Sequence, residues 1–259
     1  MYKFLIAGRK KKRMNTTSVA LQLYTVRDET AKDFTGTLRR VAALGYKGVE
    51  FAGYAGLSPQ EMKALLTELE VRAVSTHVRL EALEQDLSKE IAYCQEIGCA
   101  YLVLPWLAPD KRTGEAFLQL APRLNAFGRQ CQEAGITFCY HNHDFEFVQH
   151  DGQTLMDVLL THTDPALVKL ECDVYWAAYA DVDPSKFLQQ HAGRVPLVHV
   201  KDMTPQRTFA EVGDGTLNIA TIIDIARQNG TQEFIVENDA PTIPSLESAK
   251  RSLENIRAM

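Results

Sequence analysis

The sequence predicts a closed (β/α)₈ barrel, in which eight parallel strands are surrounded by helices. From Thr17 onward, short β-rich apolar runs alternate with amphipathic helical stretches, and nothing interrupts the alternation. Such strict alternation favours parallel strands whose two faces are both covered. The repeat occurs eight times in roughly 245 residues, which is the size of one closed barrel.

The expected strands are short runs with an apolar first half. They lie at Val19–Tyr24, Gly48–Phe51, Ala73–His77, Tyr101–Pro105, Thr137–His141, Val168–Asp173, Leu197–Lys201 and Phe234–Glu237. The expected helices lie between them, near residues 31–44, 58–70, 84–97, 113–134, 153–162, 184–192, 217–229 and 245–257. The second helix has a clear start signal, because Ser58 is followed by a proline and, three residues on, by Glu61.

A glycine after the helical stretch marks four of the joints, at Gly45, Gly98, Gly135 and Gly230. Glycine readily takes the left-handed conformation that ends a helix, and an apolar run follows each of these glycines within a few residues. A doubly wound open sheet is the alternative fold. It would need a glycine-rich phosphate loop after the first strand, where this chain has Leu23–Asp28 instead.

Composition excludes several function classes. The chain has 259 residues, 46% of them apolar, and a formal net charge of −5, so it favours neither a nucleic-acid nor an anionic-membrane partner. No apolar run approaches the ~20 residues of a membrane span. Five scattered cysteines form no CxxC pair, which indicates buried, reduced thiols in a cytoplasmic protein: Cys94, Cys99, Cys131, Cys139 and Cys172.

The first fourteen residues fall outside the repeat. A short apolar piece precedes the basic run Arg9–Arg13, whereas a signal peptide has its basic segment before a longer apolar one. We expect an extension at residues 1–14, with a single barrel domain at 15–259. A nucleic-acid-binding arm is the alternative, although short basic runs are usually just solvated.

Polar side chains gather at the C-terminal ends of the expected strands, where barrel enzymes carry their active sites. They are Gln22, Tyr24, Glu50, His77, His141, His143, Asp173, His199, Lys201 and Glu237. Single histidines are common in cores, but several at one rim favour a functional site. His150, His162 and His191 lie in a turn or beside helices, and we assign them no role.

Strand periodicity selects a metal-ligand set from these residues. Side chains alternate between faces, so the last four strands each direct one ligand-type side chain inward. The predicted ligands are His141, Asp173, His199 and Glu237. Two imidazoles and two carboxylates suit one divalent ion, with Mn²⁺ or Zn²⁺ favoured over Mg²⁺, Co²⁺ or Fe²⁺. An ion pair between Glu237 and Lys201 is the structural alternative.

Five segments give the chain a family resemblance. They are Tyr140–Phe147, Asp173–Trp176, His199–Asp202, Gly213–Gly215 and Val236–Asp239. In order and position they resemble the sugar phosphate isomerase/epimerase family, within the xylose-isomerase-like barrel superfamily. That superfamily also contains ketose 3-epimerases, inosose dehydratase and endonuclease IV. The resemblance covers Thr17 to the C-terminus and implies the barrel fold and a metal site.

The resemblance also implies a ligand order of Glu, Asp, His, Glu on the last four strands. Asp173, His199 and Glu237 match it, but the first position is His141. Epimerases of this family resemble enzymes with a two-base mechanism, in which the first and last of these glutamates exchange protons with the substrate. The histidine puts that mechanism in doubt and leaves one-base isomerisation, β-elimination, or epimerisation with a histidine base open. His143 is the alternative strand-five ligand.

The residue types suggest roles around a chelated keto sugar. We expect Glu237 to act as base, His143 as the opposing acid or base, and Lys201 to hold an oxyanion or hydroxyl. Substrate contacts are expected from Glu50, His77, Glu146, Trp106 and Trp176. The alternative for the two tryptophans is that they only pack against neighbouring side chains.

A divalent-metal-dependent sugar isomerase or epimerase is therefore the leading prediction, acting by proton abstraction next to a carbonyl. A dehydratase or lyase on a keto-sugar, keto-inositol or 3-keto-glycoside is second. An endonuclease IV-like nuclease and a non-catalytic metal-binding barrel are the remaining alternatives. Asp214 in the Gly213–Gly215 loop would repel a phosphate, which favours an unphosphorylated substrate. The resemblance further implies a homo-oligomer.

Overall fold

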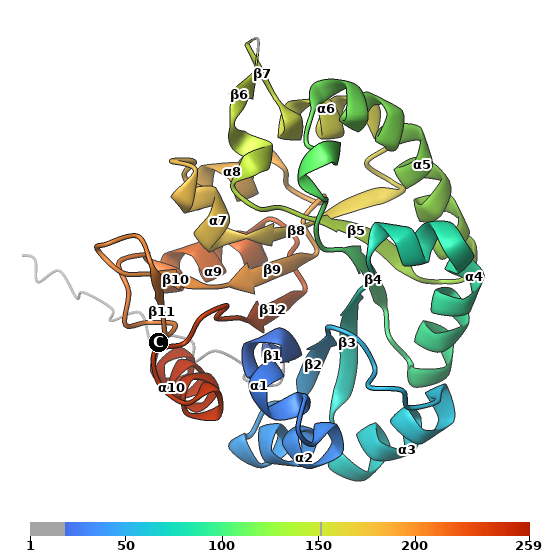
Figure 1. Cartoon of the computed structure of the whole chain (residues 1–259). Helices are drawn as coiled ribbons and strands as arrows, with labels where there is room; N and C mark the ends of the chain where they lie inside the picture. Colours follow the sequence, from blue (N-terminus) through green and yellow to red (C-terminus); the bar gives the residue numbers. More distant parts are fainter. Residues whose placement is uncertain (1–18, 151) are drawn as a thin grey trace, which may run out of the picture.

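The computed structural model describes residues 19–150 and 152–259, so the extension expected at residues 1–14 lies outside the described part of the chain. Eight parallel strands close into a barrel in the order β1-β12-β9-β8-β5-β4-β3-β2 (Figure 1). The strands are β1 Val19–Gln22, β2 Gly48–Phe51, β3 Arg72–His77, β4 Tyr101–Leu104, β5 Thr137–His141, β8 Val168–Asp173, β9 Leu197–Val200 and β12 Glu233–Val236. The predicted fold is confirmed, and no strand end is displaced by more than two residues.

Eight helices follow the strands around the outside of the barrel. They are α2 Phe34–Leu44, α3 Pro59–Leu69, α4 Leu80–Ile97, α5 Gly114–Glu133, α6 Leu155–His162, α8 Pro184–Gln190, α9 Ile219–Gln228 and α10 Ser245–Ala258. The predicted capping box at Ser58 and Glu61 is present. The four predicted joint glycines all have positive φ, and Gly45 and Gly98 are the C-caps of α2 and α4.

Several short elements at the strand ends were not predicted. A 3₁₀ turn, η2 Leu23–Val26, ends β1 early and leads into α1 Arg27–Thr30, and α7 Val174–Tyr179 follows β8 directly. Helix α4 begins four residues before the predicted start because a short helical segment precedes the main one, and the two join at Asp86, whose φ of −162° and ψ of 79° are not helical. The other short elements are the 3₁₀ turns η3 Pro109–Lys111 and η4 Phe145–Phe147, and two hairpins, β6 Gln149–His150 with β7 Gln153–Thr154 and β10 Asp202–Met203 with β11 Phe209–Ala210.

The barrel interior is divided along its axis. An apolar layer fills the lower part, formed by Ala20, Val74, Tyr101, Val103, Cys139, Leu197 and Ile235. Above it, toward the C-terminal strand ends, the inward side chains are polar and buried, including Glu50, His141 and His199. The apolar layer and the larger core between strands and helices hold a rigid frame beneath the polar groups. All five cysteines are buried and unpaired, as expected.

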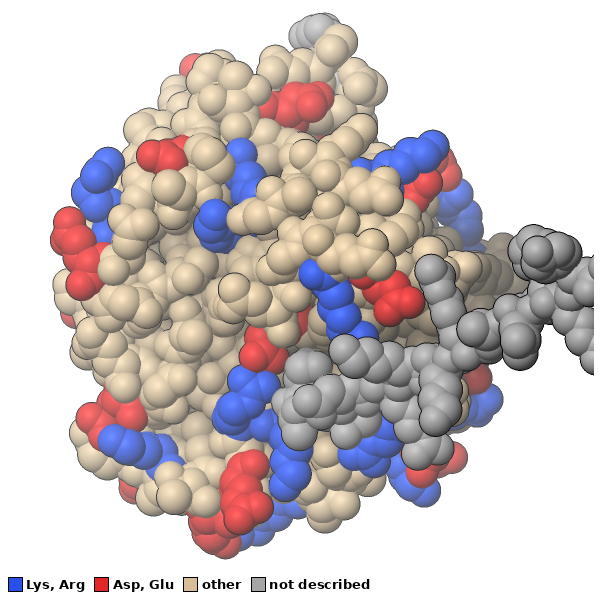
Figure 2. Space-filling model, turned by 180° about the vertical axis from the view of Figure 1, so that it is seen from behind, with Lys and Arg blue, Asp and Glu red and all other residues tan. Residues whose placement is uncertain are grey.

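No helix in the described part of the chain is both long and apolar enough to cross a membrane. On the face shown in Figure 2, basic and acidic side chains are interspersed rather than gathered by sign. This surface gives no electrostatic reason to expect a polyanionic partner on that face.

The close contact between α5 and the chain before β8 gives a test of the packing. A Cβ added at Gly128 would lie 2.3 Å from the Leu167 carbonyl oxygen, whereas one at Gly114, in the same helix, meets nothing within 4 Å. We expect Gly128→Ala to lower the free energy of unfolding by about 1–3 kcal/mol, because overpacking outweighs the gain in helix propensity. Gly114→Ala should be neutral or stabilising in the same urea titration. Equal stabilisation by both substitutions would show that α5 is not packed tightly here.

Candidate active site

A cavity of about 790 Å³ opens at the C-terminal ends of the barrel strands. Its strand-end lining is strongly polar: His77, His141, His143, Lys201, Glu237 and Asp239. Tyr24, Arg79, Trp106 and Lys111 line it from the segments that follow the strands. A second cavity, of about 540 Å³, lies at the opposite end of the barrel beside Arg72 and Glu233, and no histidine lines it. The chemistry therefore belongs to the first cavity.

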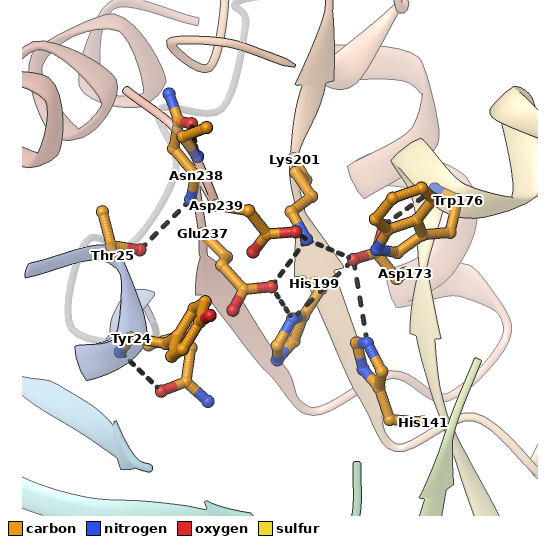
Figure 3. A network of polar contacts seen from close by, with 12 residues as sticks. Tyr24, Thr25, His141, Asp173, Trp176, His199, Lys201, Glu237, Asn238 and Asp239 are labelled. Atoms are coloured by element: carbon orange, nitrogen blue, oxygen red, sulfur yellow. Dashed lines mark hydrogen bonds and ion pairs between the residues drawn. The ribbon is translucent and has the colours of Figure 1, made fainter. Parts of the chain in front are cut away.

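Four charged residues form what we call the rim cluster: Asp173, Lys201, Glu237 and Asp239. The Lys201 ammonium donates to Asp173 Oδ2 at 3.0 Å, Glu237 Oε2 at 2.8 Å and Asp239 Oδ2 at 2.9 Å (Figure 3). Lys201 is only 1% exposed. One buried cation is thus shared by three carboxylates.

The carboxyl groups of the rim cluster differ in their pKa values. Burial opposes ionisation of Glu237, but the charges of Lys201 and His199 outweigh it and lower its pKa. Burial and the neighbouring Glu237 raise the pKa of Asp239 to about 6. Burial likewise opposes the charge on Lys201, yet Asp173 and Glu237 hold its pKa well above the usual range. Near neutral pH, Glu237 is therefore ionised, whereas Asp239 titrates closer to this range.

Five residues just below form the deep cluster: Glu50, His77, His141, Glu171 and His199. Three ring nitrogens surround one oxygen, Glu171 Oε2, with His77 Nε2 at 2.7 Å, His141 Nδ1 at 3.0 Å and His199 Nε2 at 3.3 Å. Glu50 Oε2 lies 2.6 Å from His199 Nε2 and accepts a hydrogen bond from the Gln22 side chain at 2.7 Å.

Histidine 199 joins the two clusters through its opposite ring nitrogens. Its Nδ1 lies 2.9 Å from Glu237 Oε2, while its Nε2 faces Glu50 and Glu171. Burial opposes protonation of His77, but Glu50 and Glu171 raise its pKa to about 10. Burial, followed by the nearby His199, lowers the pKa of His141 well below the usual value.

Local backbone contacts explain why these groups converge. His141 and Glu171 are register partners on β5 and β8, and Asp173 is the partner of His199 on β9. The Asn142 side chain accepts from the Asp173 backbone N–H at 3.1 Å, which ties the ends of β5 and β8 together. Asp173 Oδ1 caps α7 by accepting from the Trp176 N–H at 3.0 Å, so its other oxygen faces Lys201.

The predicted metal ligands are brought together only in part. Asp173, His199 and Glu237 each offer one ligand atom, and these atoms lie within 4.8 Å of one another. His141 groups instead with His77, Glu171 and His199, and its Nε2 is 3.9 Å from Asp173 Oδ2. Between the two predicted strand-five ligands, His141 is the one that joins such a group.

His143 lies at the edge of the cavity, with its ring 5.4 Å from that of Trp176. Its Nδ1 is buried and has no hydrogen-bond partner in the described part of the chain. Burial, followed by the charge on Lys201, lowers the pKa of His143 to about 3, so its ring is neutral at neutral pH. Trp176 packs beside Lys201, whose Nζ is 5.4 Å from the ring centroid.

The predicted substrate contacts are divided between the cavity and the layer beneath it. His77 and Trp106 line the cavity, and Trp106 is 45% exposed. Glu50 lies below, in the deep cluster, with no exposed surface. Glu146 is fully buried, where it accepts from the Tyr140 hydroxyl at 2.7 Å and from the His143 N–H at 2.8 Å. Glu146 therefore holds the turn after β5 rather than facing a substrate.

Sequence reasoning missed two carboxylates of the site, Glu171 and Asp239. The alternation that selected Asp173 also places Glu171, two residues earlier, on the same inward face. Asp239 stands two residues after Glu237, just beyond the end of β12. In both cases the signal was a spacing of two residues from a predicted metal ligand.

The Gly213–Gly215 loop does not offer free N–H groups to a phosphate. The backbone N–H groups of Gly213 and Gly215 donate to Asp202 Oδ2 at 2.9 and 3.1 Å. The Asp202 carboxylate already fills the position that a phosphate would need.

Comparisons with known proteins agree with this architecture. A family model described as "Xylose isomerase-like TIM barrel" matches residues 38–259. An inosose dehydratase of Geobacillus kaustophilus is 27% identical over 64% of this chain, which spans 61% of that relative. An inosose dehydratase of Mesomycoplasma hyopneumoniae is 25% identical, with 87% of this chain and 88% of the relative covered. A solved sugar phosphate isomerase/epimerase from Parabacteroides distasonis is 25% identical, with a TM-score of 0.80 and 91% and 96% of the two chains covered.

The buried Glu146 carboxyl predicts a pH dependence of stability. Burial raises its pKa to about 8, from 4.5 for an ordinary glutamate. Between these values the Glu146 carboxyl ionises in the unfolded chain but keeps its proton in the folded chain, so the contribution of Glu146 to wild-type stability falls as pH rises. The free energy of unfolding of Glu146→Gln, measured relative to wild type, should increase by about 1.4 kcal/mol per pH unit in that window. Parallel pH–stability curves for the two proteins would contradict the assignment.

Proposed function

The chain belongs to the xylose isomerase-like TIM barrel family, and we propose that it is a metal-assisted dehydratase that eliminates water from a keto-polyol. The sequence placed isomerisation first and elimination second. The geometry of the rim cluster and the names of the curated relatives favour the reverse order.

One observation carries the proposal: two carboxyl groups of different acidity share one ammonium. Lys201 Nζ lies 2.8 Å from Glu237 Oε2 and 2.9 Å from Asp239 Oδ2, so both groups lie on one side of the cavity. An elimination that takes a proton and releases a hydroxyl from one face of a substrate needs a base and an acid on the same side. Epimerisation needs proton-transfer groups on opposite faces of one carbon.

The different acidities assign the two roles. Glu237, whose pKa is lowered by Lys201 and His199 despite its burial, is the base. Asp239, whose pKa is raised to about 6, is the acid. Lys201 holds both carboxyl groups in place and stabilises negative charge that develops nearby on the substrate.

The reaction follows from these roles. The Glu237 carboxylate takes the proton from the carbon next to the substrate carbonyl. The electron pair of that C–H bond forms a C=C bond as the C–O bond to the neighbouring hydroxyl breaks. Asp239, in the fraction of molecules where it is protonated, gives its proton to the departing hydroxyl, which leaves as water. The products are an unsaturated ketone and water, and proton exchange with solvent restores both carboxyl groups.

The donors of the site fit a divalent cation. Two groups in the described part of the chain have ligand atoms that converge, namely Asp173, His199 and Glu237, and His77, His141, Glu171 and His199. Both contain His199 and both combine imidazole with carboxylate, which suits Zn²⁺ or Mn²⁺. When bound, such an ion polarises the substrate carbonyl and makes the neighbouring C–H bond more acidic.

The proposed substrate class is an unphosphorylated keto-inositol or a related keto-sugar. The curated relatives are named inosose dehydratase, which supports a keto-inositol. His77 and Trp106, which both line the cavity, are proposed to contact its hydroxyls and its apolar face. The occupied Gly213–Gly215 loop supports a substrate without a phosphate at that position.

An isomerase or epimerase is the second candidate. The unpartnered Nδ1 of His143 favours it, because this group provides a second proton-transfer site away from Glu237. The similar solved structure named sugar phosphate isomerase/epimerase also supports it. A DNA-repair nuclease is less well supported, because the net charge is −5 and charges of both signs are mixed on the face in Figure 2. The cytoplasmic location and the homo-oligomer stay predictions.

The base assignment predicts the behaviour of Glu237→Gln. Wild-type protein loaded with Zn²⁺ or Mn²⁺ and given a keto-inositol in D₂O should incorporate deuterium next to the carbonyl and form an enone, both followed by proton NMR. Glu237→Gln should lower both rates by about 10²–10⁴-fold. Glu233→Gln changes the same residue type at the opposite end of β12, where Glu233 pairs with Arg72, and should keep wild-type rates. Wild-type exchange in Glu237→Gln would rule out this base, and an epimer or aldose in place of the enone would favour the second candidate.

The acid assignment predicts a different defect in Asp239→Asn. This variant keeps the base, so deuterium should still enter the substrate, but water loss should slow by about 10²–10⁴-fold because the leaving hydroxyl has no proton donor. Asp214→Asn, in a surface ion pair with Arg251, is the matched control. If exchange and water loss fall together in Asp239→Asn, the residue holds Glu237 in place rather than acting as acid.

A further inference from the structure

The wall of the cavity that follows β3 and β4 is basic. Arg79 stands just after the end of β3, Lys111 ends the η3 turn after β4, and both line the cavity. Arg112 adds a third positive charge, because its guanidinium carbon lies 5.0 Å from the ring centroid of Trp106, which lines the same wall. The proposed elimination uses none of these three cations.

The two lining cations have little pairing within the protein. In the described part of the chain, the Arg79 guanidinium forms no hydrogen bond or ion pair. Lys111 Nζ lies 3.9 Å from Asp110 Oδ2, and the Asp110 side chain is 75% exposed, so this ion pair is weak. Glu81 also lines the cavity, but among the described residues it pairs with neither cation. Both cations are therefore available to a ligand.

The barrel places this basic wall across the cavity from the proposed base and acid. In the closed strand order, β4 lies directly opposite β12. Glu237 and Asp239 come directly after β12, whereas Lys111 follows β4 and Arg79 follows the neighbouring β3. A substrate whose reacting carbon faces Glu237 therefore has its far end at the basic wall.

The cavity has room for a substituent at that far end. Its volume of about 790 Å³ exceeds the need of one six-membered ring, because sites of roughly 300–1,000 Å³ hold drug-sized ligands. The flat arginine guanidinium can donate to both oxygens of a carboxylate at once, and a lysine adds a single positive charge. A carboxylate at this wall would also be kept away from Glu237, which would repel it at close range.

The charge of the wall fits a carboxylate better than a phosphate. The segments at residues 78–83 and 105–112 contain three cations and two carboxylates, which leaves a net charge of +1. This balances the single negative charge of a carboxylate, whereas a phosphate monoester carries nearly two negative charges at neutral pH.

We infer that Arg79 and Lys111 form an outer subsite for a carboxylate, so that the preferred substrate is a keto-polyol with a carboxylate at the end remote from its reacting carbon. The direction in which the substrate lies rests on the proposed function. The subsite itself does not, because the two cations line the cavity whichever reaction takes place there. Arg79 and Lys111 determine specificity and take no part in the chemical step.

Binding of non-reacting sugars tests the subsite without turnover. D-galacturonate and D-galactose differ only in a carboxylate or a hydroxymethyl group on the ring, and each is titrated into full-length, zinc-loaded protein. We expect galacturonate to bind at least about 10-fold more tightly than galactose, since it gains charged hydrogen bonds, and to shift the ¹⁵N NMR signal of Arg79 Nε. Equal affinities, or an unshifted Arg79 signal at saturation, would overturn the inference. Tighter binding of galactose 6-phosphate than of galacturonate would overturn the choice of a carboxylate.

Matched substitutions locate the effect. Arg79→Gln and Lys111→Gln should each weaken galacturonate binding by about 5–30-fold and leave galactose binding unchanged, because only the carboxylate loses a charged partner. Arg129→Gln removes an exposed arginine of α5 that does not line the cavity, and should bind both sugars like wild type. Wild-type affinity for galacturonate in both Arg79→Gln and Lys111→Gln would overturn the inference. Melting curves confirm that the variants are folded, and the exchange experiment on Glu237→Gln tests the reaction separately.

Discussion

The buried Lys201 ammonium is the interaction on which the rest of the site depends. A lysine that is 1% exposed remains charged only if nearby carboxylates compensate its loss of hydration. Asp173, Glu237 and Asp239 do so at 2.8–3.0 Å. The same contacts fix the orientation of all three carboxyl groups, keep Glu237 ionised and fill the space between Asp173 and Glu237. The proposed acid–base pair follows from this one charge.

The barrel supplies the rigidity that this charge distribution requires. The apolar layer below and the helices outside leave the strand ends little freedom, so register alone places Glu171 beside His141 and His199 beside Asp173. Short contacts after the strands complete the alignment, such as the Asn142 bond to the Asp173 backbone and the buried Glu146 behind His143. His199, which contacts both clusters, connects the deep cluster to the proposed base.

The sequence predicted the fold almost completely because strand–helix alternation and helix-ending glycines are local signals. It also predicted the polar rim, since strand alternation identifies inward side chains. It did not distinguish the residues of the rim cluster from those of the deep cluster. Choosing one ligand per strand omitted Glu171, which lies one layer below Asp173, and whether Lys201 pairs with carboxylates or binds substrate depends on distances between distant strands. Glu146 was expected to contact substrate, but it lies in the η4 turn, where its side chain is buried.

The position of Lys201 is tested most directly by a crystal structure of the protein without substrate. We expect the Lys201 ammonium within hydrogen-bonding distance of Asp173, Glu237 and Asp239, as at the present 2.8–3.0 Å. A Lys201 side chain directed away from Glu237 and Asp239 would contradict the conclusion that this ammonium holds the proposed base and acid together.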